Sequence, residues 1–345
     1  MKAGELSTPV LLADAGTLEA NMAAMSTVRP GPMLRPHVKA FKCTALAARL
    51  ADDGHQGFCC ATVREVEGMA AAGLGEDLLL ANEVVDRRAT ERLGALVASG
   101  KARVTVAVDS LVSIEVAAAG GIREVLIDVD VGMPRCGCKP ADAGRLAEQA
   151  RSTGLMVRGT MGYEGHLQHV VDRADRVRRT EVAMGLLSAA HAEVGGDVVS
   201  GGGTGTWDCN PVVTELQAGS FVLMDGDYAR LNLPFAEGLV LLTTVVSARS
   251  GSHAALDGGL KALAMDSGGP VLVEDQGGSA AVLVCSDEHT TVTGGSWQVG
   301  DRVGLRPAHI DPTIAKHEVL HLVDDATAGG DAEVLDSWII DLRGW

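Results

Sequence analysis

The chain has 345 residues, a mass of 35.6 kDa, a formal net charge of −16 and a pI near 5.0. This acidic balance repels phosphate backbones and anionic lipids, so we expect a small molecule as partner rather than nucleic acid or a membrane. The N-terminus lacks a basic segment followed by an apolar stretch, and no run of about twenty apolar residues occurs, which predicts a soluble, cytoplasmic protein. The seven cysteines are scattered and odd in number, which predicts reduced thiols.

Short runs of β-strand composition alternate with segments rich in Ala, Leu, Glu and Arg that often end at Gly, as crossover helices do. Eight such strand–helix units predict an α/β fold, a TIM-like (β/α)8 barrel, because parallel strands need crossover connections. An open doubly wound sheet is the alternative. The predicted strands are residues 33–39, 57–61, 77–81, 103–108, 124–129, 157–163, 197–200 and 219–224.

The pattern changes after about residue 235. Strand-like runs at 239–247, 281–285 and 302–305 are joined by Gly, Ser and Asp turns without helical separators, which predicts an antiparallel β domain. A further strand candidate at 9–13 precedes the barrel and could pair with this domain. We therefore expect a barrel over residues 16–235 and a β domain made of residues 1–15 and 236–345.

Reactive side chains follow several predicted strands at their carboxyl ends, where barrel enzymes carry their chemistry. Lys39 ends the first strand, and Arg135 follows the fifth. The sixth is followed by Tyr163, His166 and His169. We expect these side chains on one rim of the barrel.

A glycine-rich segment, Gly201-Gly202-Gly203-Thr204-Gly205-Thr206, follows the seventh predicted strand. Glycines let backbone N–H groups approach a phosphate, and hydroxyls add donors; a plain flexible turn is the alternative. A lysine, a phosphate loop and an arginine on one rim suggest pyridoxal 5′-phosphate bound covalently to the lysine.

Five segments, in the same order and over nearly the whole chain, resemble the D-threonine aldolase/D-serine dehydratase family. This family has the alanine-racemase-like fold of type III pyridoxal phosphate enzymes, and the resemblance is strongest to the D-threonine aldolases. The segments are Arg35-Pro36-His37-Val38-Lys39, residues 130–137, Gly162-Tyr163-Glu164-Gly165-His166, the glycine segment 201–206, and residues 214–220.

The resemblance implies a role for each matching residue. Lys39 matches the lysine that holds the cofactor, and Arg135 matches an arginine at its phenolic oxygen. Gln217 stands where alanine racemases place an arginine beside the pyridine nitrogen, and Tyr163 matches a tyrosine beside the cofactor. His169 matches the catalytic base, with His166 as the reserve. The implied phosphate contacts are Gly202, Gly203, Thr204, Gly219 and Ser220.

A second motif lies at Pro307-Ala308-His309-Ile310-Asp311-Pro312-Thr313. On a strand, residues two apart face the same side, so His309 and Asp311 could chelate one divalent ion. The motif resembles the family's metal site. D-serine dehydratases typically carry Cys at the second position, whereas Asp311 is a hard oxygen ligand that favours Mn²⁺ or Mg²⁺ over Zn²⁺.

These features predict a lyase that cleaves D-β-hydroxy-α-amino acids, D-threonine among them, to glycine and an aldehyde. A dehydratase acting on D-serine or D-threo-3-hydroxyaspartate is the alternative on the same scaffold. A zinc metalloprotease using His317-Glu318-x-x-His321 is a remote alternative. That mechanism needs the motif on a helix, so that both histidines share one face, whereas this segment has the composition of a strand. The resemblance also allows a homodimer.

Overall fold

The computed structural model describes residues 1–273 and 280–344, which fall into two compact units. The α/β unit consists mainly of Ser26–Lys39 and Leu46–Gly219. The β unit consists of Met1–Met25, Ala40–Ala45 and Ser220–Arg343. The domain limits at residues 16 and 235 remain a prediction.

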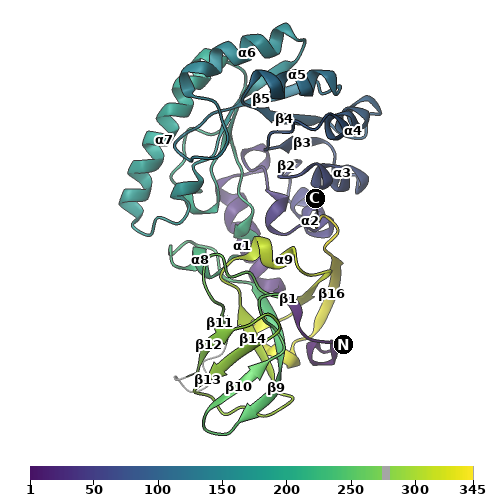
Figure 1. The fold of residues 1–345 in the computed structure, drawn as a ribbon, viewed down its shortest axis with the longest axis vertical. Helices are drawn as coiled ribbons and strands as arrows, with labels where there is room; N and C mark the ends of the chain where they lie inside the picture. Colours follow the sequence, from purple (N-terminus) through teal and green to yellow (C-terminus); the bar gives the residue numbers. More distant parts are fainter. Residues whose placement is uncertain (274–279, 345) are drawn as a thin grey trace. The chain divides into compact units, whose positions relative to one another are not determined.

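Seven parallel strands form the sheet of the α/β unit, in the order β2-β3-β4-β5-β6-β7-β8, of which β2 to β5 are labelled in Figure 1. The strands are short apolar runs, and β4 is buried along its whole length, as expected for parallel strands covered on both faces. Their bounds are β2 Gly57–Cys60, β3 Asp77–Leu80, β4 Val104–Val108, β5 Glu124–Asp128, β6 Met156–Gly162, β7 Val198–Gly201 and β8 Glu215–Leu216.

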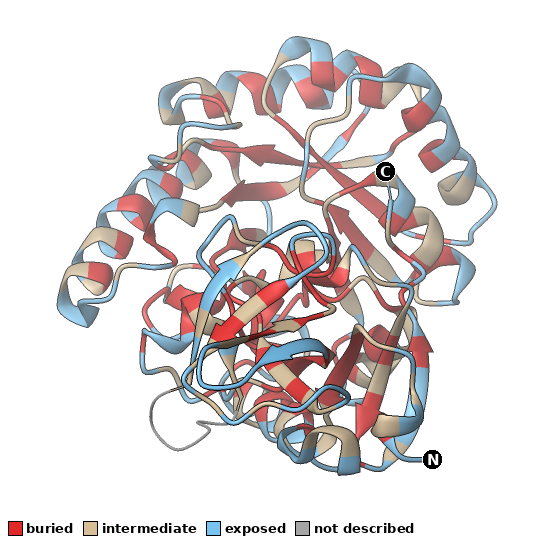
Figure 2. Ribbon diagram, turned by 60° about the horizontal axis from the view of Figure 1, so that its bottom comes forward, coloured by how far each residue is buried: buried red, intermediate tan, exposed pale blue. Residues whose placement is uncertain are grey.

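Helices connect these strands, and several begin at a side chain that caps the first turn. Thr62 accepts a hydrogen bond from the N–H of Glu65, and Asp86, Ser110 and Asp172 cap the helices that follow them. In Figure 2 the helices carry buried residues along one side and exposed residues along the other. Their bounds are α2 Thr44–Asp52, α3 Val63–Ala71, α4 Arg87–Ala98, α5 Leu111–Ala119, α6 Ala143–Ser152 and α7 Arg173–Val194.

The first predicted barrel strand, 33–39, is not a regular strand. Its backbone forms isolated parallel bridges, Leu34 to Leu216 of β8 and His37 to Cys59 of β2, and then a 3-10 turn over Val38–Ala40. Pro36 has no N–H to give to a ladder, which explains the interruption. The segment still joins the two edge strands of the sheet by backbone hydrogen bonds of 2.9–3.0 Å.

The eighth predicted strand, 219–224, is also wrong, because β8 lies earlier and Ser220–Val222 is a 3-10 turn. The other six predicted strands are confirmed. The structure therefore shows a TIM-type half-barrel of seven parallel strands with crossover helices, and the place of an eighth strand is taken by an irregular segment.

The β unit contains a mixed sheet of nine strands among the described residues, in the order β12-β13-β10-β9-β1-β15-β16, with β14 beside β9 and β11 beside β14. The N-terminal strand β1 joins it, as predicted. Because β1 pairs with β15 in parallel, the sheet is mixed and the prediction of a purely antiparallel domain is wrong. The strand bounds are β1 Val10–Asp14, β9 Leu239–Arg249, β10 His253–Leu256, β11 Val271–Leu272, β12 Ala281–Cys285, β13 Thr290–Thr293, β14 Arg302–Arg306, β15 Val319–Val323 and β16 Val334–Ile339.

Three helices belong to this part of the chain: α1 Ala15–Val28, α8 Gly226–Ala229 and α9 Ile310–Ile314. The core beneath the sheet includes Leu12 of β1 and Leu242 of β9, neither of which is exposed.

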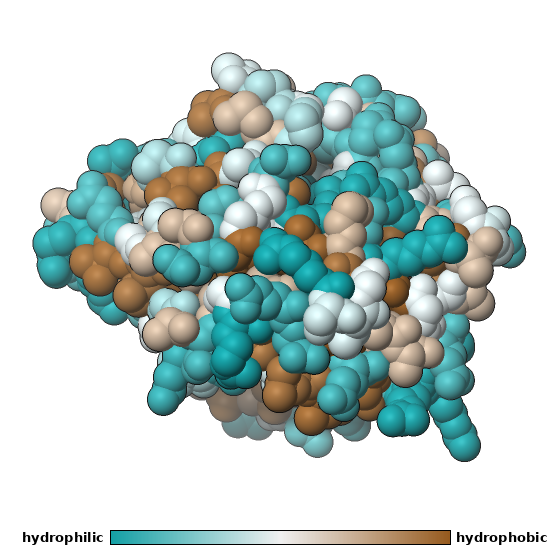
Figure 3. Space-filling view, turned by 90° about the horizontal axis from the view of Figure 1, so that it is seen from above, coloured by the Kyte–Doolittle hydropathy of each residue, from teal (hydrophilic) through white to brown (hydrophobic). Residues whose placement is uncertain are grey.

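Figure 3 shows a face on which hydrophilic residues dominate and hydrophobic ones are scattered, as is normal for protein surfaces. Among the described residues no helix is both long enough and apolar enough to cross a membrane.

Candidate active site

Lys39 lies in the 3-10 turn that follows the bridging segment between β8 and β2. His37 pairs with Cys59 near the end of β2, so Lys39 lies beyond the carboxyl ends of both neighbouring strands. Lys39 itself is partly buried. The structure thus places the predicted cofactor lysine on the rim of the α/β unit that barrel enzymes use.

Gln217 ties together the ends of three strands next to Lys39. Its Nε2 donates to Ser200 Oγ at 2.8 Å, and its Oε1 accepts from the Cys59 thiol at 3.2 Å. Burial raises the pKa of Cys59 strongly, so the thiol stays a neutral donor. The amide of Gln217 has a second N–H. It is an uncharged donor, from which a pyridine nitrogen can accept a hydrogen bond.

The glycine segment after β7 is held by internal hydrogen bonds. The N–H of Gly202 donates to Glu164, that of Gly203 to Thr206 Oγ1, and that of Gly205 to Gln168 Oε1, at 3.2, 3.2 and 2.9 Å. These amides are therefore engaged within the protein. The phosphate contacts at Gly202, Gly203, Thr204, Gly219 and Ser220 stay predictions.

Close packing explains why glycines are needed here. A Cβ atom on Gly203 would lie 2.5 Å from Gln168 Oε1, and one on Gly205 would lie 1.9 Å from the Gln168 carbonyl oxygen. Gly202 has a φ of +76°, which favours glycine. The segment thus packs closely against the turn after β6, a contact that sequence reasoning missed.

The loops after β5 and β6 bring the remaining predicted residues near one another. The Arg135 guanidinium carbon lies 5.6 Å from the centre of the Tyr163 ring, a cation–π geometry. The His166 ring lies beside Gly132, within 3.3 Å of where a Cβ would be. Burial lowers the pKa of His166, and the nearby Arg179 lowers it further. His169 follows in the same loop and is exposed.

Sequence reasoning missed a cluster of carboxylates after β3, β4 and β5. Asp128, at the end of β5, is 7% exposed, and burial together with Glu83 and Asp109 raises its pKa well above the usual value. Arg135 acts in the opposite direction. The cluster thus brings Arg135, the predicted cofactor arginine, into electrostatic interaction with the buried carboxyl group of Asp128. No local sequence motif predicts this cluster.

In the β unit, the predicted metal ligands do not lie on a strand. His309 is the N-cap of α9 and Asp311 belongs to its first turn, where Pro312 is also tolerated. Nevertheless His309 Nε2 lies 3.9 Å from Asp311 Oδ2. The motif therefore brings the two side chains together, although the strand geometry assumed for it is wrong.

Neighbouring side chains fix this pair. His309 Nδ1 lies 2.7 Å from Oδ2 of Asp266, and Asp311 Oδ2 accepts from Ser220 Oγ at 3.3 Å. A carboxylate on the outer nitrogen of a histidine is the usual support of a metal ligand, so the donor set fits a divalent ion. No group of three or more His, Cys, Asp or Glu residues suited to a metal occurs in the described part of the chain.

The metalloprotease alternative is wrong. His321 lies within strand β15 and His317 just before it, so the two do not share a helix face. His317 Nε2 is 2.8 Å from the Ala262 carbonyl oxygen, and His321 Nδ1 is 2.7 Å from Ser337 Oγ. Both rings therefore serve the packing of the β unit.

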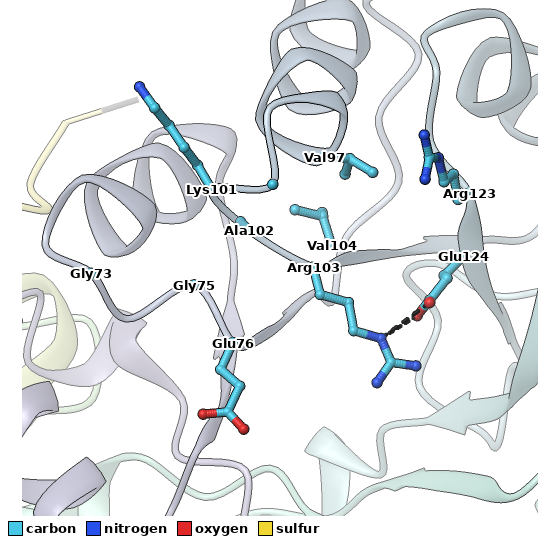
Figure 4. A pocket seen from close by; sticks show the side chains of 11 residues that line it. Gly73, Gly75, Glu76, Val97, Lys101, Ala102, Arg103, Val104, Arg123 and Glu124 are labelled. Carbon is cyan, nitrogen blue, oxygen red and sulfur yellow. Dashed lines mark hydrogen bonds and ion pairs between the residues drawn. The ribbon is translucent and has the colours of Figure 1, made fainter.

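A cavity of about 520 Å³ in the α/β unit lies away from all these residues (Figure 4). It is lined by residues at the amino ends of β3, β4 and β5, including the Arg103–Glu124 ion pair at 2.9 Å. Parallel strands carry their chemistry at the opposite ends. We therefore do not assign the cavity to the active site.

Comparison with known proteins agrees with this geometry. Residues 13–224 match the family model for the alanine racemase N-terminal domain, and residues 238–323 match that for a putative serine dehydratase domain. D-threonine aldolase from an Arthrobacter species is 35% identical over 366 aligned positions, covering 99% of this chain and 93% of that protein. 3-Hydroxy-D-aspartate aldolase from Paracoccus denitrificans (strain Pd 1222) is 32% identical, covering 92% and 89%.

Among solved structures, D-threonine aldolase from Filomicrobium marinum superposes with a TM-score of 0.91 at 33% identity, covering 99% of this chain and 97% of that one. The predicted resemblance is therefore confirmed at the level of the family. The chain belongs to the alanine racemase-like family of pyridoxal phosphate enzymes, in the group that carries a D-serine dehydratase-type domain.

Proposed function

We propose that the protein cleaves D-β-hydroxy-α-amino acids between Cα and Cβ, releasing glycine and an aldehyde, with pyridoxal phosphate and a divalent ion as cofactors. The observation that carries this proposal is the paired His309 and Asp311 with Asp266 behind the histidine, in a chain whose other unit presents Lys39 beside Gln217. Aldolases among the relatives support it.

The α/β unit supplies the residues that would hold pyridoxal phosphate. Lys39 would bind it covalently, the amide of Gln217 would face its pyridine nitrogen, and Arg135 would contact its phenolic oxygen. Thr204 of the glycine segment and Gly219 would contact the phosphate. Once bound, the cofactor supplies a sink for the electron pair released when the Cα–Cβ bond breaks.

A base must take the proton of the β-hydroxyl as the carbonyl of the aldehyde forms. His169 is our candidate, because imidazole has an ordinary pKa suited to this task and the side chain is exposed in the loop after β6. His166, whose pKa is lowered, is the reserve. Tyr163 would need a large pKa shift to serve as base and instead lines the site.

His309 and Asp311 would hold the divalent ion, Mn²⁺ or Mg²⁺ rather than Zn²⁺, because Asp311 offers a hard oxygen. A divalent ion supplies Lewis-acid polarisation of an oxygen atom.

The second candidate is dehydration, which eliminates the β-hydroxyl and gives ammonia and a keto acid. Residues 238–323 match the family model for a putative serine dehydratase domain, which supports dehydration as the second candidate. The two reactions differ in all their products, so a product assay separates them.

The decisive experiment incubates purified protein with pyridoxal phosphate, Mn²⁺ and D-threonine, and measures glycine, acetaldehyde and ammonia. We expect glycine and acetaldehyde in equal amounts and little product after chelation of the metal. The visible absorption of bound cofactor should be lost in Lys39→Ala and retained in the matched variant Lys316→Ala. Ammonia as the main product would favour the dehydratase, and a protein without bound cofactor would overturn both candidates.

A further inference from the structure

Buried side chains join the turn after β6 to the glycine segment after β7. Glu164 Oε1 accepts from Thr206 Oγ1 at 2.7 Å and from Asn210 Nδ2 at 3.0 Å. Its other oxygen, Oε2, accepts from the N–H of Gly202 at 3.2 Å. Glu164 is 0% exposed, so its carboxyl group is shielded from water and bound by Gly202 and Thr206 of the segment and by Asn210 beyond it.

Gln168, one turn further on, makes the second link. Its Oε1 accepts from the N–H of Gly205 at 2.9 Å, and its Nε2 donates to Thr206 Oγ1 at 3.1 Å. Thr206 thus receives a hydrogen bond from Gln168 and another from the N–H of Gly203. The two side chains therefore hold two backbone amides of the segment, those of Gly202 and Gly205, and the Thr206 hydroxyl, which in turn accepts from the N–H of Gly203.

The direction of these hydrogen bonds is determined. The Thr206 hydroxyl has one hydrogen, and since it already accepts two hydrogen bonds, that hydrogen goes to Glu164. All three groups facing Glu164 are therefore donors, which suits an ionised carboxylate. Burial raises the pKa of Glu164, and these hydrogen bonds act in the opposite direction. A glutamine at position 164 would place its NH₂ group, itself a donor, opposite one of these three donors.

The segment lies close to Lys39 through the sheet. The N–H of Gln217 donates to the carbonyl of Gly201 at 2.9 Å, and the N–H of His37 donates to the carbonyl of Ala218 at 3.0 Å. A Cβ on Gly202 would lie 2.4 Å from Leu216 of β8. These contacts therefore couple the position of the glycine segment to that of β8, the strand next to Lys39.

We propose that Glu164 is a positioning residue for the phosphate of the cofactor, fixing segment 201–206 through Gly202 and Thr206 before the ligand binds. This inference rests on the proposed function, because it takes the segment as the phosphate site. A segment already held in its bound conformation loses less conformational entropy on binding, so affinity rises without any contact between Glu164 and the ligand.

The test compares two ligands that differ only in the phosphate, pyridoxal 5′-phosphate and pyridoxal. The full-length apoprotein is titrated with each, and binding is followed by absorbance. We expect Glu164→Gln to weaken binding of pyridoxal 5′-phosphate by about tenfold or more, as for a disrupted hydrogen bond to a charged group. Binding of pyridoxal should change by less than about twofold, because it relies on Lys39 and not on the segment.

A second pair of variants covers the case in which Glu164→Gln does not fold. Thr206→Val removes the hydroxyl at nearly constant shape and should reproduce the selective loss, whereas Thr206→Ser keeps the hydroxyl and should restore the preference. Glu181→Gln is the matched control, since Glu181 is exposed on α7. Thermal unfolding of each apoprotein identifies any general destabilisation.

The outcomes separate this inference from the proposed function. Equal weakening of both ligands in Glu164→Gln and Thr206→Val, or no weakening of either, overturns the positioning role. Wild-type protein that binds neither ligand overturns the proposed function as well. Wild-type protein that prefers the phosphate ester, with the preference lost in Thr206→Val and regained in Thr206→Ser, supports the proposal.

Discussion

His309 Nδ1 lies 2.7 Å from Oδ2 of Asp266, a residue 43 positions earlier in the chain. This contact decides which ring nitrogen faces Asp311. We expect Asp266→Asn to weaken Mn²⁺ binding by about tenfold to a hundredfold, because the histidine loses its charged support. Isothermal titration with Mn²⁺ measures the change. Asp287→Asn, an exposed substitution in the same unit, should bind as the wild type does, and an unchanged affinity in Asp266→Asn would contradict the supporting role.

Asp311 should determine which metal is preferred. Asp311→Cys replaces a hard oxygen by a soft sulfur, so we expect the preference to move from Mn²⁺ toward Zn²⁺. Competition between the two ions, followed by elemental analysis of the protein, measures this. His309→Ala should lose both ions. A variant Asp311→Cys that still selects Mn²⁺ would show that Asp311 is not a ligand.

Arg35 should be essential for the stability of the α/β unit. It is 4% exposed, and it forms ion pairs with Glu215 at 2.7 Å and with Asp77 at 2.9 Å. Arg35→Met leaves the buried Glu215 without this partner, while Asp77 keeps its ion pair with Arg158, so we expect a loss of about 3–5 kcal/mol in the free energy of unfolding. Urea denaturation measures the loss. Arg92→Met, which breaks an exposed pair with Glu67, should cost less than about 1 kcal/mol; a similar cost for both would refute the prediction.

His317 should make the β unit sensitive to mild acid. Burial lowers the pKa of His317, although its hydrogen bond to the Ala262 carbonyl acts in the opposite direction. Because the folded pKa lies below the unfolded value of about 6.5, the unfolded chain binds more protons as the pH falls through this region. We therefore expect stability to be full above about pH 7 and to decline toward pH 5.

The variant His317→Gln should flatten this dependence, since glutamine can donate to the same carbonyl but does not titrate. Thermal unfolding at a series of pH values between about 5 and 8 is the measurement. His253→Gln, which replaces a histidine of strand β10 in the same unit, serves as control. If both variants keep the wild-type pH profile, His317 is not the group responsible.

The strands of the α/β unit could be predicted because continuous apolar runs such as β4 alternate with capped helices, and both signals are local. The two failures have local causes as well. Pro36 interrupts the segment before Lys39, and the chain after Gly219 forms a tight 3-10 turn where its apolar composition suggested a strand.

The candidate site shows where sequence reasoning ends. The resemblance implies roles for Lys39, His309 and Asp311, whereas it implies none for Asp266 and Glu164, which act on residues about forty positions away in sequence. Such partners meet only because the fold brings their segments together, as β6 and β7 do for Glu164 and Thr206. A glycine segment is equally ambiguous, since the need for close packing and the need to bind phosphate select the same residue.

The place of β1 has a consequence for how the protein is made. Leu11 pairs with Leu241 on one side and with Leu320 on the other, so β1 obtains its neighbours only after residues more than 200 positions later have been synthesised. The strands β2 to β8 follow one another in sequence and need no such wait. During translation the α/β unit can therefore fold while β1 remains unpaired, and the long-range contacts of the β unit form last.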